Sequence, residues 1–447
     1  MSRPFATLPP NGYRSNMAEP VRVGLLGCGV VGAATARILL DHASELETRT
    51  GAPIEIARIA VRDVSVDRGL QLPDAVWTTD PWDVVRDPSI DVVVEVIGGV
   101  EPARELILEA IATKKHVVTA NKELLSTHGT EVMKAAEANG VDLLFEASVA
   151  GGIPIIRPIR ESLAGDRVTR VMGIVNGTTN FILTRMSEMG ESFDEALEQA
   201  IRLGYAEADP TADVDGHDAA AKIAILASLA FDARVMASDV PTEGIRAITR
   251  ADIASAHQLG YEVKLLAVAE LTDGKISARV HPAMIPRTHP LAAVRDVFNA
   301  VFVQGEQAGD LMFLGRGAGG APTASAVVGD LVEIARNASQ GARTPAYVGF
   351  HDDAAIRSEE ETAVRYYIVL SVADQPGVLS EVAGVFARHG VSIASVRQEG
   401  FGNEATLMLI THIATEGQHR ATLSGLRTHG GVRSIDSTIR VEGTQEG

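Results

Sequence analysis

The segment GYAEADPTADVDGHDAAAK (204–222) combines carboxylates with a lysine at a spacing suited to acid–base chemistry. It leads into an apolar stretch, and we predict a helix over 217–230 on which Asp218 and Lys222 share one face. A structural salt bridge is the commoner explanation of such a pair. The apolar surroundings and the nearby carboxylates favour a functional site instead; these are Glu207, Asp209, Asp213 and Asp215.

A second lysine, Lys122, follows the predicted strand KHVVTA (115–120). The carboxyl ends of parallel strands form the ligand-binding edge of an α/β sheet, so we expect Lys122 at that edge. Transfer of a hydride between an alcohol and a carbonyl compound needs a group that exchanges a proton with the oxygen, and charges that hold the substrate. Lys122, Asp218 and Lys222 are the candidates for these roles.

A glycine-rich turn near the N-terminus predicts the cofactor. Gly27-Cys28-Gly29-Val30-Val31-Gly32 is a GxGxxG motif that follows the apolar run VRVGLLG (21–27) and opens a helical pattern. The first glycine permits a tight turn, the second lets the backbone approach a pyrophosphate, and the third lets helix and strand pack closely. The N–H groups at the helix start attract the anion. In this context the motif predicts a dinucleotide site.

The residues after the second predicted strand, IEIARIAV (54–61), leave the choice of dinucleotide open. Arg62 can bind the 2′-phosphate of NADP, whereas Asp63 can bind the ribose hydroxyls of NAD. We expect NADP, with NAD as the alternative, although Arg62 is also explained as a solvated loop charge. The one cysteine, Cys28, lies in the phosphate loop, which excludes a catalytic thiolate at the substrate carbonyl and leaves direct hydride transfer.

Strands and helices alternate over 21–150, an order typical of βαβ units and a doubly wound, mostly parallel Rossmann-type sheet. We predict a dinucleotide-binding domain there, completed by a later segment near 315–338. Residues 151–338 have a mixed order and predict an α+β domain for substrate binding, catalysis and dimerisation. The predicted strands of the first domain are 21–27, 54–61, 91–98, 115–120 and 141–148, with a helix at about 130–139. Those of the second are 168–177, 262–270, 276–281 and 299–305, with helices at 178–189, 193–203, 217–230 and 322–338.

Residues 339–364 have the composition of a linker. Beyond it, 365–442 has the order βαββαβ, which predicts a ferredoxin-like domain. Residues 1–20 are rich in Pro, Asn and Ser without an apolar core, so we interpret them as a disordered leader and not as a signal peptide.

The formal net charge of −18 argues against nucleic acid and anionic membranes as partners. A single cysteine excludes an intramolecular disulfide and a multi-cysteine metal site. No apolar run reaches the roughly 18 residues of a membrane span. We therefore expect a cytoplasmic protein.

Several motifs in the same order resemble homoserine dehydrogenase over about residues 21–335. They are TANKELLS (119–126), NGTTN (176–180), LGYAEADPTADVDGHDAAAK (203–222) and GRGAGGAPTASAVVGD (315–330). The resemblance implies that Lys222 is the acid–base residue, that Glu207 and Asp218 hold homoserine, and that Lys122 lies between cofactor and substrate. Asp213 is a weaker substrate candidate. Backbone N–H groups of the turn Asn176–Thr179, including Gly177 and Thr178, would receive the homoserine carboxylate.

The same resemblance implies contacts that the residue pattern alone does not predict. Gly204 and Gly319 would contact the cofactor. A monovalent cation, Na⁺ or K⁺, would bind at Glu146 and the backbone carbonyls of Val149, Gly151 and Ile153.

The motif DQPGVL (374–379) resembles the ACT domain, a small-molecule sensor that pairs with copies of itself. Pro376 and Gly377 suit a tight turn whose N–H groups can take an amino-acid carboxylate. The resemblance implies threonine as effector, and a dimerisation module without a ligand is the alternative.

Together these features imply an NADP(H)-dependent homoserine dehydrogenase of threonine and methionine biosynthesis that forms a homo-oligomer, a dimer or tetramer. One alternative is another nicotinamide-dependent amino- or hydroxy-acid dehydrogenase. The other is a catalytically inactive amino-acid sensor, but such a protein would not need all four of Lys122, Glu207, Asp218 and Lys222.

Overall fold

The computed structural model describes residues 19–344, 350, 353, 355–401 and 403–443. Most of the predicted leader (1–20) and part of the predicted linker (339–364) lie outside the described residues. Within the described part, no helix is long and apolar enough to cross a membrane.

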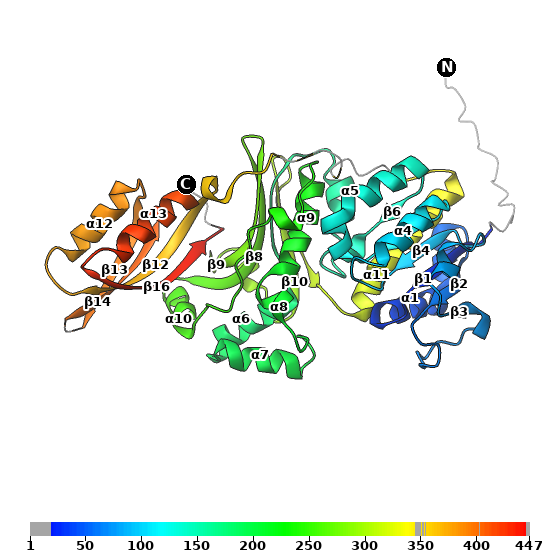
Figure 1. Ribbon diagram of the computed structural model, residues 1–447, viewed down its shortest axis with the longest axis horizontal. Helices are drawn as coiled ribbons and strands as arrows, with labels where there is room; N and C mark the ends of the chain where they lie inside the picture. Colours follow the sequence, from blue (N-terminus) through cyan, green and yellow to red (C-terminus); the bar gives the residue numbers. More distant parts are fainter. Residues whose placement is uncertain (1–18, 345–349, 351–352, 354, 402, 444–447) are drawn as a thin grey trace, which may run out of the picture.

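A parallel six-stranded sheet with the order β3-β2-β1-β4-β5-β6 forms the nucleotide-binding fold, at the right of Figure 1. Helices α1, α2 and α11 pack together, while α3, α4 and α5 form a second group. The predicted Rossmann-type sheet is therefore confirmed, and α11 completes it from far along the chain. The strands are β1 Val21–Leu26, β2 Ile54–Ala60, β3 Trp77–Thr78, β4 Val92–Glu95, β5 His116–Thr119 and β6 Leu143–Leu144. The helices are α1 Val30–Asp41, α2 Ala43–Thr50, α3 Trp82–Val85, α4 Ala103–Ala112, α5 Lys122–Asn139 and α11 Gly320–Gln340.

Two strands of this sheet are shorter than predicted, and α5 is longer. β4 ends at Glu95 because the buried Glu95 carboxylate accepts hydrogen bonds from the N–H groups of Ile97 and Gly98 and turns the chain. β6 ends before a 3₁₀ turn at Glu146–Ser148. The side chain of Asn121 caps α5 at the N–H of Leu124, so the helix begins at Lys122 and not near residue 130.

The second sheet has ten strands in the order β11-β10-β7-β8-β9-β16-β12-β14-β13, with β15 beside β12. Helices α6 and α9 pack on the strands of its first half. The sequence prediction missed β11 and α10 and ended β9 too early. This half contains β7 Val168–Ile174, β8 Tyr261–Thr272, β9 Lys275–Pro286, β10 Phe298–Gly305 and β11 Gly309–Arg316. Its helices are α6 Gly177–Met189, α7 Phe193–Arg202, α8 Thr211–Val214, α9 His217–Ala230 and α10 Arg250–Gln258.

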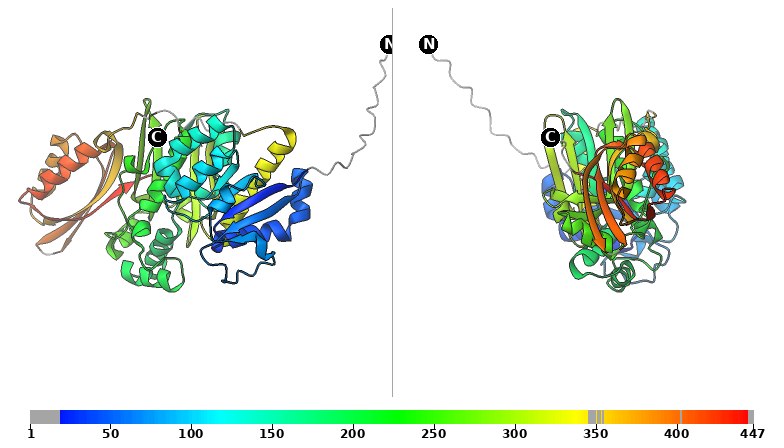
Figure 2. Two further views of the ribbon diagram at one scale, coloured as in Figure 1. Left: turned by 45° about the vertical axis from the view of Figure 1, so that its right-hand side comes forward. Right: turned by 90° about the vertical axis from the view of Figure 1, so that its left-hand side faces the viewer.

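The C-terminal part has the predicted βαββαβ order with one short extra strand, and its helices α12 and α13 lie at the left of Figure 1. Its sheet is continuous with the preceding one, because β16 runs parallel to β9 at Arg440 and Val441. Figure 2 shows this continuity from two further directions. The elements are β12 Ala363–Ala373, α12 Val378–Arg388, β13 Ile393–Phe401, β14 Glu404–Thr411, β15 Ala414–Thr415, α13 Glu416–Arg427 and β16 Val432–Val441.

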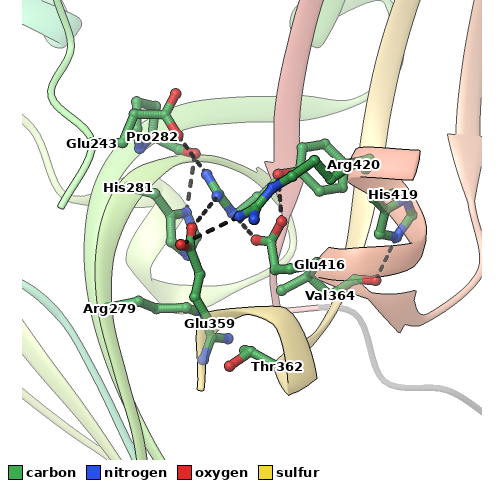
Figure 3. Close-up of polar contacts among 12 residues, drawn as sticks. Glu243, Arg279, His281, Pro282, Glu359, Thr362, Val364, Glu416, His419 and Arg420 are labelled. Atoms are coloured by element: carbon green, nitrogen blue, oxygen red, sulfur yellow. Dashed lines mark hydrogen bonds and ion pairs between the residues drawn. The ribbon is translucent and has the colours of Figure 1, made fainter. Parts of the chain in front are cut away.

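Charged side chains fill the junction where β16 meets β9. Figure 3 shows Glu243 and His281 on one side facing Glu416 of α13 on the other. Arg440 of β16 bridges the two sides, since it donates to Glu416 and to Glu243 at 2.5 Å each. Two residues further along, Glu442 accepts a hydrogen bond from the buried Arg279 of β9. The C-terminal domain is thus held to the middle domain by ion pairs as well as by strand pairing.

Candidate active site

A cavity of about 510 Å³ lies where the carboxyl edge of the parallel sheet meets α6 and α9. Its walls bring together ten of the residues singled out from the sequence. They are Lys122, Gly151, Gly177, Thr178, Gly204, Glu207, Asp213, Asp218, Lys222 and Gly319. These positions come from five separate parts of the chain, so their convergence identifies this cavity as the candidate active site.

Asp218 is the centre of the charged groups in the cavity. Lys222, one helical turn later on α9, donates to Oδ2 of Asp218 at 2.7 Å and to the carbonyl oxygen of Val175 at 2.7 Å. Lys122, the first residue of α5, lies 3.1 Å from the other carboxylate oxygen. The side-chain amide of Asn176 donates to Asp218 at 2.9 Å and to Asp213 at 2.7 Å. Two ammonium groups therefore share one buried carboxylate.

The electrostatics keep this cluster charged. Burial opposes ionisation of Asp218, but the ammonium groups of Lys222 and Lys122 outweigh it and lower the pKa of this carboxyl to about 2. In return, the attraction of Asp218 raises the pKa of Lys122 against the effect of burial. The carboxylate thus carries its negative charge over the whole physiological range, and Lys122 carries its positive charge.

The N-terminus of α6 forms the wall next to these charges. Asn176 caps the helix by accepting from the N–H of Thr179, so that N–H group is not free for a ligand, contrary to the prediction for this turn. No hydrogen bond within the described residues uses the N–H groups of Gly177 and Thr178. Glu207 is exposed, on the loop that the hydroxyl of Thr178 holds through the carbonyl of Tyr205. An amino acid can therefore place its carboxylate at α6 and its ammonium at Glu207.

The glycine-rich turn has the predicted strand–turn–helix geometry. Gly27 has a φ of +98°, and a Cβ on Gly32 would lie 2.2 Å from the carbonyl oxygen of Gly27, so the turn closes only with glycine at these positions. A Cβ on Gly29 would meet nothing within 4 Å, so packing within the protein does not require glycine at this position. Val30 is exposed and lies against Gly320 at the start of α11.

The second strand is followed by two residues with different environments. The Asp63 carboxylate accepts hydrogen bonds from the N–H and the hydroxyl of Ser65. Arg62 is exposed and forms no ion pair within the described part of the chain. Sequence reasoning missed Arg68, whose guanidinium donates to the carbonyls of Cys28 and Asp63 beside the phosphate loop. The position of Arg68, a basic residue in the loop after the second strand, was the feature of the sequence that could have identified it.

Cys28 is buried, and burial raises the pKa of its thiol, while the positive charges of Arg68 and Arg37 act in the opposite direction. It does not line the cavity. Both facts agree with its interpretation as a packing residue and not a nucleophile.

The loop between β6 and the following helix contains the four positions of the implied cation site. The Glu146 carboxylate accepts hydrogen bonds from the N–H groups of Ile155, Ile156 and Arg157. The carbonyl oxygens of Val149, Gly151 and Ile153 accept no hydrogen bond among the described residues, although all three residues are buried. Buried, unpartnered carbonyls fit a hard monovalent cation. No group of three or more His, Cys, Asp or Glu side chains gathers as a metal site in the described chain.

Several side chains of the cavity wall were not predicted, and the amides of Asn176 and Asn299 and the guanidinium of Arg316 are among them. Asn176 was expected to act only through its backbone, and its amide in fact links Asp213 to Asp218. Arg316 and Asn299 also line the cavity. Arg316 is the last residue of β11, a strand that the sequence prediction missed. Asn299 is the second residue of β10, where the sequence has the pattern of an ordinary buried strand.

Comparison with known proteins assigns the family. The homoserine dehydrogenase profile matches residues 154–332, its NAD-binding domain 27–146, and the ACT domain 366–424. The chain is 52% identical over 438 residues to homoserine dehydrogenase of Mycobacterium tuberculosis, covering 95% of this chain and 98% of that protein. It is 49% identical over 427 residues to the enzyme of Corynebacterium glutamicum, covering 94% and 96%.

Comparison with solved structures gives the same family. A homoserine dehydrogenase from Thiobacillus denitrificans superposes with a TM-score of 0.90 at 43% identity, over 95% of this chain and 99% of that one. A hyperthermophilic archaeal homoserine dehydrogenase in complex with NADPH gives a TM-score of 0.62 at 29% identity, over 73% and 99%. The C-terminal domain is an ACT domain, as its motif predicted. The chain belongs to the homoserine dehydrogenase family, the NAD(P)-dependent oxidoreductases that act on the CH–OH group of homoserine.

Proposed function

We propose that this cavity interconverts L-aspartate 4-semialdehyde and L-homoserine with Lys222 as the acid–base residue and NADP(H) as the preferred cofactor. The observation that carries the proposal is the cluster of Lys122, Asp218 and Lys222 at the carboxyl edge of the parallel sheet, within a cavity that the Gly-rich loop before α11 joins to the phosphate loop. The cofactor supplies or accepts the hydride. The residues of the cavity wall transfer the proton and bind the substrate.

Lys222 protonates the carbonyl oxygen during reduction and removes the hydroxyl proton during oxidation. Asp218 and the Val175 carbonyl hold its Nζ, so one N–H direction is left for the substrate oxygen. In this arrangement the ammonium group of Lys222 lies next to the substrate oxygen, where its positive charge stabilises a developing alkoxide. Asn176 holds Asp218 and Asp213 in place, and Glu207 binds the substrate ammonium.

The preference for NADP follows from the two residues after β2. The Asp63 carboxylate is already engaged by Ser65, which leaves it poorly placed to bind a ribose hydroxyl. Arg62 is exposed and unpaired within the described residues, so it is available for a 2′-phosphate. Gly27, Gly29, Val30, Val31 and Gly32 would bind the pyrophosphate, and Gly204 and Gly319 would contact the rest of the cofactor.

A monovalent cation at Glu146, Val149, Gly151 and Ile153 would order the loop that forms the cavity wall at Gly151. The free carbonyls of that loop support this part of the proposal. For the ACT domain we propose an amino-acid effector, with threonine as the first candidate, at the turn that leads into α12. Gly377, with a φ of +98°, is the N-cap of that helix, so Pro376 lies in the turn just before it. A homo-oligomer and a cytoplasmic location complete the proposal.

The test is oxidation of NADPH and of NADH by the purified protein with aspartate 4-semialdehyde, with and without threonine. Faster oxidation of NADPH supports the reaction and the cofactor together, and a change with threonine supports the effector. If a folded sample that binds NADPH oxidises neither cofactor, the substrate assignment is wrong. Replacing NaCl or KCl with choline chloride in the same assay tests the cation, which predicts a loss of rate.

A further inference from the structure

The amide of Asn299 is a buried polar group in the cavity that has no assigned role. Asn299 is the second residue of β10, it is 1% exposed, and it lines the catalytic cavity. Its Oδ1 atom has no hydrogen-bond partner. Among the described residues that line this cavity, no other buried side chain has an oxygen or nitrogen in this condition. An unpaired buried acceptor costs free energy, so its retention beside a binding site points to a ligand that supplies the donor.

Two glycines make the room that this amide occupies. A Cβ on Gly317 would lie 2.1 Å from Cγ of Asn299, and a Cβ on Gly177 would lie 3.5 Å from its Oδ1. Gly177 opens α6, the helix that faces the substrate. Gly317 belongs to the loop that leads into α11. The amide therefore lies between the start of α6 and the loop that leads into α11.

The loop connects Asn299 to the phosphate-binding turn. Three residues after Gly317, a Cβ on Gly320 would lie 3.1 Å from the carbonyl oxygen of Val30. The loop also contacts Gly151 at the carboxyl edge of the sheet, where a Cβ would lie 2.5 Å from the carbonyl oxygen of Gly317. A dinucleotide whose pyrophosphate bound at Val30 would extend along this loop into the cavity, with its nicotinamide end toward the substrate residues. That end of the loop is where Asn299 lies.

We propose that Oδ1 of Asn299 accepts a hydrogen bond from the carboxamide NH₂ of the nicotinamide ring. The proposal rests on the proposed binding of a nicotinamide dinucleotide in this cavity. The other charged and polar groups of the wall suit an amino acid, and Asp218 and Asp213 already have donors in Lys122, Lys222 and Asn176. The carboxamide of nicotinamide has an NH₂ group that can donate to the unpaired Oδ1 of Asn299, and fixing this carboxamide sets which ring face is presented to the substrate.

The experiment compares Asn299→Ala and Asn299→Leu with the wild type by binding. Dissociation constants are measured for NADP and for its 3-acetylpyridine analogue, which has a methyl group in place of the NH₂, by displacement of fluorescent NADPH. We expect the wild type to bind NADP more tightly than the analogue. In both variants the affinity for NADP falls about three- to tenfold, the value of one hydrogen bond, while the analogue is little affected, so the preference disappears. Gln304→Ala, an amide on the same strand that bonds Asp310 instead, is the matched control and keeps the preference.

Thermal unfolding without ligand separates this role from a structural one. Because Oδ1 has no partner in the protein, Asn299→Leu is expected to leave the melting temperature of the ligand-free protein unchanged or higher. A lower melting temperature with equal loss of affinity for both dinucleotides would overturn the proposal. So would unchanged NADP binding with a raised KM for homoserine, which would make Asn299 a substrate ligand. If the wild type bound neither NADPH nor NADP, the proposed function itself would fail, and this assignment with it.

Discussion

The Nζ atom of Lys222 lies 2.7 Å from Oδ2 of Asp218, which is 9% exposed and one turn earlier on the same helix. Lys122 reaches the second oxygen of that carboxylate from the start of α5. The pair is therefore not a surface salt bridge of a helix. It is part of a buried cluster in which one carboxylate orients two ammonium groups toward a cavity.

Replacing Lys222 with Ala removes the proposed proton donor. We expect turnover to fall by roughly 10²- to 10⁴-fold, while the dissociation constant for NADPH changes little, because Lys222 binds no phosphate. Steady-state rates and NADPH fluorescence titration check this. Lys134→Ala, an exposed lysine of α5, is the control. Nearly normal turnover in the Lys222 variant would show that another group is the acid.

Asp218→Asn tests the charge state of the cluster. The folded-state pKa of Asp218 is about 2, below the ordinary value of 3.8, so its ionisation stabilises the folded protein above pH 4 and this contribution is lost as the pH falls toward 2. The shift corresponds to roughly 2 kcal/mol. Urea unfolding should therefore give a stability difference between wild type and variant that is constant from pH 8 to pH 5. A difference that shrinks between pH 7 and pH 5 would mean that Asp218 titrates there.

Gly29→Ala and Gly32→Ala form a matched pair within one motif. A methyl group on Gly29 meets no protein atom within 4 Å, so we expect a normal melting temperature and weaker NADPH binding. A methyl group on Gly32 meets the Gly27 carbonyl at 2.2 Å, so α1 must shift and the ligand-free protein should be destabilised by about 1–3 kcal/mol. Calorimetry and fluorescence titration separate the two effects. Equal loss of stability in both variants would contradict the distinction.

Arg62→Ala tests the cofactor preference. We expect KM for NADPH to rise about tenfold and KM for NADH to stay the same, because NADH lacks the 2′-phosphate that the guanidinium would bind. Arg68→Ala is a useful companion, since Arg68 supports the backbone of Cys28 and Asp63 and its loss should weaken both cofactors. Equal effects of Arg62→Ala on both cofactors would refute a phosphate contact.

Arg440→Met tests the junction shown in Figure 3. The variant leaves Glu416, which is 5% exposed, without its cation, so we expect a loss of about 3–5 kcal/mol in unfolding free energy. Adding Glu416→Gln should recover part of that loss. Arg433→Met, which breaks an exposed pair with Glu404 inside the ACT domain, should cost less than about 1 kcal/mol. Similar losses in both single variants would show that the junction is no stronger than a surface pair.

Features that depend on short-range physics could be predicted from the sequence alone. Gly27 and Gly32 are needed for steric reasons that hold within six residues, and the i,i+4 spacing of Asp218 and Lys222 follows from helix geometry alone. The alternation of apolar strands and helices was sufficient to predict the Rossmann-type sheet, and the βαββαβ order was sufficient to predict the ferredoxin-like fold of the C-terminal domain. The ends of β4 and α5 were less predictable, because the side chains of Glu95 and Asn121 capture backbone N–H groups there.

The contacts between these features depend on the tertiary structure. Lys122 joins Asp218 from a helix 96 residues earlier in the chain, and α11 returns to complete the first sheet. Asn299 and Arg316 reach the cavity because β10 and β11 form a hairpin at the edge of the second sheet, and the local sequence of Asn299 is that of an ordinary buried strand. The junction at Arg440 likewise depends on pairing between β16 and β9. Contacts between distant segments depend on how whole layers pack, and no residue window in the sequence contains that information.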